Sequence, residues 1–119
     1  MEVDRNNEQQ KIAGGFDHCF VRPNSAVGED WIAKVHHPKS GRVLLVDSDA
    51  PGLQLYTGNH LRGSQSGKHG KSFLKYGGLC LEPQAFPNAP NEASFPSAQL
   101  EPGERYEHSI SYRFLVDPE

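Results

Sequence analysis

Three short segments carry side chains that could bind a small polar molecule or move a proton. The first, residues 79–84, reads LCLEPQ. In an extended strand Glu82 and Gln84 share one face with Cys80, and the two leucines occupy the other. Partial burial of a carboxylic acid raises its pKa and makes it a usable general base. A solvated glutamate at a strand end is the simpler interpretation of this segment taken alone.

The second segment, residues 52–59, reads GLQLYTGN and places Gln54 and Tyr56 on one strand face. An amide can hydrogen-bond hydroxyl groups, and an aromatic ring can cover the C–H face of a sugar. An ordinary half-exposed strand explains this segment alone better.

The third segment, residues 14–20, reads GGFDHCF. Two glycines free the backbone before Asp17, whose carboxylate could accept hydrogen bonds from ligand hydroxyl groups. A turn in which Asp17 starts a strand explains the segment equally well. We assign no chemistry to His18.

Other polar clusters do not match a known site. Residues 64–71 read SQSGKHGK, but the order of residues departs from a phosphate-binding loop and no helical pattern follows. A flexible surface loop is the better interpretation. The histidines lack the spacing of a zinc site, so no metal is expected.

The elements that must position these residues are strands. Short apolar runs are punctuated by Gly, Pro, Asn and Asp, which is typical of an all-β chain. We predict a polar, disordered lead-in and then strands joined by turns and loops. The lead-in covers residues 1–13, a hairpin joins 31–37 to 42–46, further strands cover 53–57, 72–82 and 106–116, and long loops cover 58–71 and 83–103.

Composition limits the function further. The net charge of −3 and pI near 6.0 do not favour nucleic-acid binding. No apolar run is long enough to span a membrane, and the N-terminus lacks a secretory signal. We therefore expect a cytoplasmic protein with reduced Cys19 and Cys80. Only 35% of the 119 residues are hydrophobic, so the strands would have open edges unless another segment or chain covers them.

Taken together, five strings resemble the C-terminal part of the galactose mutarotase (aldose 1-epimerase) family. They are GFDHCFV from Gly15, AKVHHPKSGRVLLV (33–46), PGLQLYTGNHLRG (51–63), GGLCLEPQAFPNAPNEASFP (77–96) and LEPGERYEHSISYRF (100–114). Each string is weak alone, but their order and spacing are specific. The resemblance implies that residues 14–119 are part of an antiparallel β-sandwich of the mutarotase-like supersandwich type.

The resemblance also implies the chemistry and its residues. The family interconverts the α and β anomers of galactose or glucose without a cofactor or metal. Glu82 matches the family's general base, Asp17 its ligand-binding aspartate, and Gln54 its substrate-contacting glutamine. The base removes the proton of the anomeric hydroxyl, and an acid histidine protonates the ring oxygen. In the family, that histidine lies upstream of the region that this chain matches.

Two features depart from the family pattern. Pro83 stands where a threonine usually follows the base, and proline removes a backbone donor beside Glu82. Residues 75–78, KYGG, also differ from the usual sequence. The alternative hypothesis is therefore a catalytically incomplete remnant of the family that binds carbohydrate or another protein. A missing N-terminal segment or a separate chain could complete the sandwich.

Overall fold

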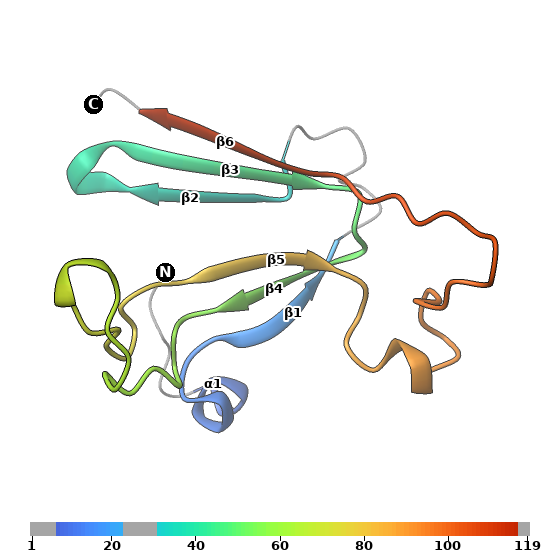
Figure 1. Cartoon of the computed structure of the whole chain (residues 1–119), viewed down its shortest axis with the longest axis horizontal. Helices are drawn as coiled ribbons and strands as arrows, with labels where there is room; N and C mark the ends of the chain where they lie inside the picture. Colours follow the sequence, from blue (N-terminus) through green and yellow to red (C-terminus); the bar gives the residue numbers. More distant parts are fainter. Residues whose placement is uncertain (1–6, 23–30, 117–119) are drawn as a thin grey trace. The chain divides into compact units, whose positions relative to one another are not determined.

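The structure is a computed structural model that describes residues 7–22 and 31–116. Two three-stranded sheets and one short α-helix dominate it, as Figure 1 shows. This confirms the predicted all-β class and is consistent with a sandwich-type fold. The elements are α1 (Glu8–Ala13), β1 (Asp17–Val21), β2 (Ala33–His37), η2 (Pro38–Ser40), β3 (Arg42–Ser48), β4 (Gly52–Tyr56), η3 (Lys68–Gly70), β5 (Cys80–Gln84), η4 (Ala89–Asn91) and β6 (Ile110–Val116), where η marks a 3₁₀ turn.

One sheet has the strand order β2-β3-β6 and contains the predicted hairpin. β2 and β3 pair antiparallel from Ala33↔Val46 to His37↔Arg42, and the 3₁₀ turn η2 joins them. β3 also pairs with all of β6, from Arg42↔Val116 to Ser48↔Ile110. The central strand β3 supplies Val43 and Val46, two of the buried hydrophobic residues among those described. The hairpin is thus confirmed, with β2 starting at Ala33 rather than at residue 31.

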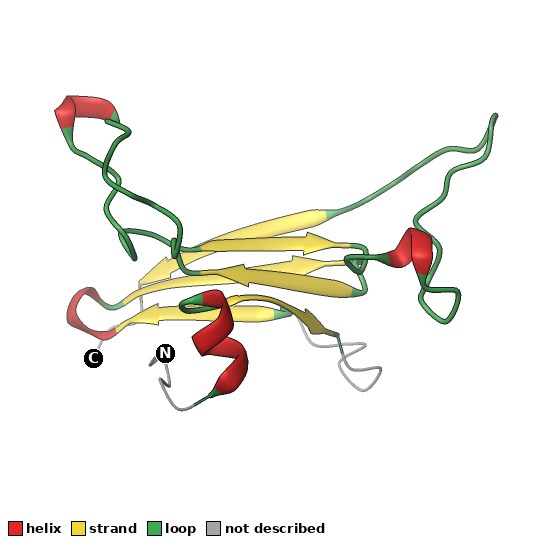
Figure 2. Ribbon diagram, turned by 90° about the horizontal axis from the view of Figure 1, so that it is seen from below, coloured by secondary structure: helices red, strands yellow, loops and turns green. Residues whose placement is uncertain are grey.

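The other sheet has the order β1-β4-β5, so β4 lies between the strands that carry Asp17 and Glu82. Here the predicted strand 72–82 was too long, because only Cys80–Gln84 is strand. Residues 58–78 instead form an ordered loop that contains the 3₁₀ turn η3, drawn red within the green excursion at the upper left of Figure 2. The backbone N–H of Tyr76 donates to the carbonyl of Gly58 at 3.2 Å, and Ser66 pairs with Ser72 inside this loop.

The segment predicted as a polar lead-in contains helix α1, while residues 1–6 lie outside the described part. The side chain of Asn7 caps the helix by accepting the backbone N–H groups of Gln9 and Gln10 at 3.0 and 3.2 Å. Gly14 ends it in the left-handed conformation, with φ 66°. The short helix therefore depends on its two caps, and neither was recognised in the sequence.

Few side chains of the described part are buried. The buried hydrophobic residues are Val43, Val46, Ala50, Leu55 and Ala89. The chain divides into two compact units: one holds residues up to Phe20 with 54–82, and the other holds 21–53 with residues from 83 onward.

Every residue of β6 is exposed. No described helix has the length and apolar character needed to cross a bilayer.

The predicted final strand starts four residues late, at Ile110, because the β3–β4 turn holds the residues before it. The carboxylate of Asp49 accepts the backbone N–H of Ser109 at 3.1 Å and faces Nδ1 of His108 at 2.6 Å. These bonds fix residues 108 and 109 at the turn before β6 begins pairing with β3.

The charge of Asp49 should therefore stabilise the fold in a pH-dependent way. The backbone N–H of Ser109, together with His108, holds the pKa of Asp49 below its ordinary value of 3.8. Because the folded state binds this proton less readily, the contribution is complete above pH 3.8 and is lost as the pH falls through the lowered value.

We expect Asp49→Asn to lower the urea midpoint of unfolding at neutral pH and to lower it less near about pH 2. The variant keeps the shape of the side chain and one oxygen acceptor for Ser109, and it removes the charge. An equal difference between the two proteins at both pH values would contradict this assignment.

Candidate functional site

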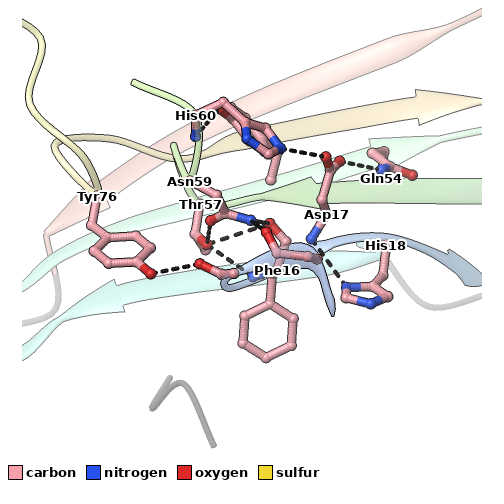
Figure 3. Close-up of polar contacts among 11 residues, drawn as sticks. Phe16, Asp17, His18, Gln54, Thr57, Asn59, His60 and Tyr76 are labelled. Carbon is pink, nitrogen blue, oxygen red and sulfur yellow. Dashed lines mark hydrogen bonds and ion pairs between the residues drawn. The ribbon is translucent and has the colours of Figure 1, made fainter. Parts of the chain in front are cut away.

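The centre of the candidate site is a hydrogen bond between two of the residues selected from the sequence. Nε2 of Gln54 on β4 donates to Oδ1 of Asp17 on β1 at 2.8 Å, as Figure 3 shows. A carboxylate can only accept, so this bond fixes which end of the amide faces Asp17. The opposite end, Oε1 of Gln54, is covered from solvent and has no hydrogen-bond partner among the described residues. The site therefore holds one oriented donor and one unsatisfied acceptor.

His60 is a third member of the site that the sequence did not single out. Its Nε2 lies 3.8 Å from Oδ2 of Asp17, on the side opposite Gln54 (Figure 3). Tyr56 holds His60 in two ways: the rings stack at 6.1 Å between centroids and 19° between planes, and the phenol oxygen accepts the backbone N–H of His60 at 3.0 Å. The polar face of β4 thus supports an imidazole beside Asp17.

The turn before Asp17 is held by the residues that follow β4. Oγ1 of Thr57 accepts the backbone N–H of Phe16 at 3.0 Å and donates to Oδ1 of Asn59 at 2.6 Å. Nδ2 of Asn59 donates to the carbonyls of Phe16 at 2.8 Å and Ala13 at 3.0 Å. Asn59 is 5% exposed, so these bonds are shielded from water. We name this cluster of Phe16, Thr57 and Asn59 the turn anchor.

Two further contacts complete the turn anchor. A Cβ atom on Gly15 would lie 2.3 Å from Oδ1 of Asn59, and Gly15 has φ +142°, which favours glycine. Tyr76 donates its hydroxyl proton to the carbonyl of Gly14 from the loop before β5 (Figure 3). The sequence signal for this anchor is Thr57-Gly58-Asn59 directly after a strand, a pattern typical of a turn.

His18 has a structural contact that accounts for it. Its Nδ1 accepts the backbone N–H of Asp17 at 3.0 Å, and its ring meets Phe16 edge-on at 6.2 Å. The side chain therefore fixes the backbone at the start of β1.

Glu82 lies on the neighbouring strand β5, and strand alternation places it on the same face as Gln54. Leu55 and Pro83 are buried, and strand alternation turns Gln54 and Glu82, each one residue before them, to the opposite face, where Glu82 is exposed and Gln54 is half-buried. The carboxylate of Glu82 is exposed and makes no hydrogen bond or ion pair with residues 7–22 or 31–116. A carboxylate that acts as a base was expected to be partly buried, and Glu82 is not buried by the described residues of this chain.

Pro83 is accommodated without breaking the strand. It lies inside β5, which pairs only with β4 in the described part, and proline is tolerated where one strand edge is unpaired. Pro83 therefore removes one backbone N–H donor beside Glu82 and leaves the strand intact.

Two other features of the described residues bear on the kind of site. No group of three or more His, Cys, Asp or Glu side chains could hold a metal ion in this part of the chain. A hollow of about 460 Å³ in the second unit is lined by Asp49 and His108 together with Pro96, Leu100 and Tyr106. Asp49 and His108 have a structural role there, because their contacts hold the residues just before β6.

In this all-β chain a carboxylate on one strand is joined to an oriented amide on the next. Such an arrangement suits proteins that bind small polar ligands. Comparison with known proteins narrows this class. The aldose 1-epimerase family model matches residues 2–113, which includes most of the lead-in that the resemblance had left out. The chain therefore belongs to the aldose 1-epimerase family, as the sequence predicted.

Several relatives support this assignment. The chain is 47% identical over 108 residues to galactose mutarotase from Sus scrofa and 44% identical over 108 residues to that from Bos taurus. In both cases the match covers 91% of this chain and 31% of the relative. Aldose 1-epimerase from Escherichia coli (strain K12) is 32% identical over 113 residues, covering 93% of this chain and 32% of the relative. The chain thus spans about a third of the length of these proteins.

The geometry of the turn anchor predicts a ranked effect of alanine at three glycines. Gly15→Ala should lower the free energy of unfolding most, because it adds a clash with Asn59 to a strained backbone. Gly70→Ala should cost about 1 kcal/mol, since its φ is +70° but nothing lies within 4 Å. Gly78→Ala, with open space and no positive φ, should change stability by less than about 0.5 kcal/mol.

Urea unfolding of the three variants measures this ranking. If Gly15→Ala were no more destabilising than Gly70→Ala, the contact between Gly15 and Asn59 would not contribute to the fold.

Proposed function

We propose that the protein containing this chain is an aldose 1-epimerase that interconverts the α and β anomers of galactose or glucose. The observation that carries the proposal is the hydrogen bond between Gln54 and Asp17, in the sheet that also holds Glu82, in a chain of the aldose 1-epimerase family. The relatives named galactose mutarotase and aldose 1-epimerase support the reaction and the sugar. A cytoplasmic location remains part of the proposal.

In the proposed reaction Glu82 is the general base. Its carboxylate takes the proton of the anomeric hydroxyl while an acid gives a proton to the ring oxygen. The C1–O5 bond breaks as the C1 carbonyl forms, and the sugar becomes the open-chain aldehyde. After rotation about C1–C2 the same proton transfers run in reverse and close the ring as the other anomer. No atom or charge is gained or lost over the cycle.

Asp17 and Gln54 would hold the sugar while this happens. Asp17 offers carboxylate lone pairs to hydroxyl protons, and the bond from Gln54 fixes the direction of that carboxylate. Oε1 of Gln54 is an acceptor without a partner, and a buried unsatisfied acceptor costs about 1–3 kcal/mol. A small side-chain movement that exposes Oε1 to a ligand hydroxyl would recover part of this cost.

We further propose that a segment N-terminal to these residues, or a separate chain, supplies the acid and completes the sandwich. The exposed strand β6 and the exposed Glu82 support this, because both lie open in the described part. The relatives are about three times as long as the matched region, which leaves room for such a segment. Cover over Glu82 would also provide the burial that a carboxylate base requires.

The same observations motivate the alternative, a carbohydrate-binding remnant without catalysis. Glu82 is exposed and has no partner to orient it among the described residues, and Pro83 alters the strand edge beside it. This protein would bind a hexose through Asp17 and Gln54 and leave its anomers unchanged. Polarimetry separates the two functions.

The test is the rate at which pure α-galactose reaches anomeric equilibrium in the presence of the protein that contains this chain. Glu82→Gln should lower the rate by about 10²–10⁴-fold, the usual contribution of a general base, because the amide cannot accept the proton. Glu107→Gln is the matched control. Glu107 is also exposed and forms an ion pair with Arg105 at 2.6 Å, outside the candidate site, so its loss should leave the rate unchanged.

A rate that Glu82→Gln leaves unchanged would contradict the base assignment. Hexose binding by the wild-type protein without acceleration of the anomeric equilibrium would favour the binding remnant instead.

A further inference from the structure

One oxygen of the Asp17 carboxylate, Oδ2, is not bound by Gln54 and suggests how this site selects its ligand. Oδ1 is occupied by the amide of Gln54 at 2.8 Å. Oδ2 faces Nε2 of His60 at 3.8 Å, a separation too long for a direct hydrogen bond. Oδ2 therefore keeps a free acceptor position with an imidazole nitrogen beside it.

The imidazole is accessible and held in place, as a ligand-binding group must be. The side chain of His60 is 70% exposed and that of Asp17 37% exposed. Tyr56 stacks on the imidazole ring and binds the backbone N–H of the same residue, which restricts the conformations open to His60. The preorganised side chain would lose less conformational entropy when a ligand binds than a free one.

An acceptor next to a donor matches two adjacent hydroxyl groups. One hydroxyl can donate its proton to Oδ2 of Asp17, while its neighbour accepts a hydrogen bond from the N–H of His60. A hydroxyl that donates to a carboxylate is polarised, and such chains of hydrogen bonds strengthen one another. Two hydroxyls on distant carbons cannot reach both groups at once.

We propose that His60 is a specificity-determining residue that, together with Asp17, binds a pair of adjacent sugar hydroxyl groups. The inference rests on the proposed function, since it assumes that the ligand is a hexose. It goes beyond the family resemblance, which gave His60 no role.

The test is titration calorimetry of galactose and its monodeoxy analogues with wild-type protein and with His60→Phe. Phenylalanine keeps a planar ring for stacking on Tyr56 and lacks the N–H donor. We expect the variant to bind galactose about 3- to 10-fold more weakly, the effect of one hydrogen bond. For the analogue that lacks the hydroxyl bound by His60, wild type and variant should bind equally.

His60→Gln provides the matched rescue, because its amide restores an N–H donor at a similar reach. It should recover the preference for galactose over that one analogue. Equal weakening of every ligand by His60→Phe, or no weakening at all, would overturn the role of His60 and leave the proposed function standing. A folded wild-type protein that binds no hexose would instead contradict the proposed function itself.

Discussion

The site depends on the way Asn59 holds the turn between α1 and β1. The Asn59 side chain satisfies the carbonyls of Ala13 and Phe16, and its own oxygen is satisfied by Thr57. A buried amide must pair all of its donors and acceptors or pay a large desolvation cost, so this geometry is demanding. It requires Gly15 at the point of closest approach. Because Asp17 follows this turn directly, its position is set by the same bonds.

A second consequence concerns Gln54 and His60, the two residues on either side of Asp17, which come from one part of the chain. β4 carries Gln54 and Tyr56, and the residues just after it hold both the turn anchor and His60. A shift in β4 would therefore move the amide, the imidazole and the aspartate together. Glu82 depends less on this anchor, since it reaches the face only through the pairing of β5 with β4. In the proposed function, sugar binding and proton transfer would thus depend on different local contacts.

The sequence predicted the strands where alternation was strong and failed where side chains compete with the backbone ladder. The hairpin of β2 and β3 followed from its pattern of apolar residues and its turn. The start of β6 did not, because Asp49 binds Ser109 and His108 from a distant turn. Helix α1 was missed because its stability comes from two caps, Asn7 and Gly14, rather than from an apolar face.

The contacts within the candidate site were harder to predict than the strands that carry it. Strand periodicity could suggest that Gln54 and Glu82 point outward, but only the fold shows that Asp17 bonds Gln54 across two strands. His60 was invisible because no pattern of spacing links it to Asp17, 43 residues earlier by the numbering. The exposure of Glu82 also could not be foreseen, since burial depends on segments that lie elsewhere in the sequence.

The central claim is that Asp17, Gln54 and Glu82 form one sugar-binding face. Titration of galactose into the ¹⁵N-labelled protein, followed by amide chemical shifts, tests it most directly. The account predicts that the largest shifts fall on the backbone amides of these three residues and on the side-chain amide of Gln54. Shifts concentrated around Asp49 and His108, with none at Gln54, would place the sugar in the hollow of the second unit and contradict the account.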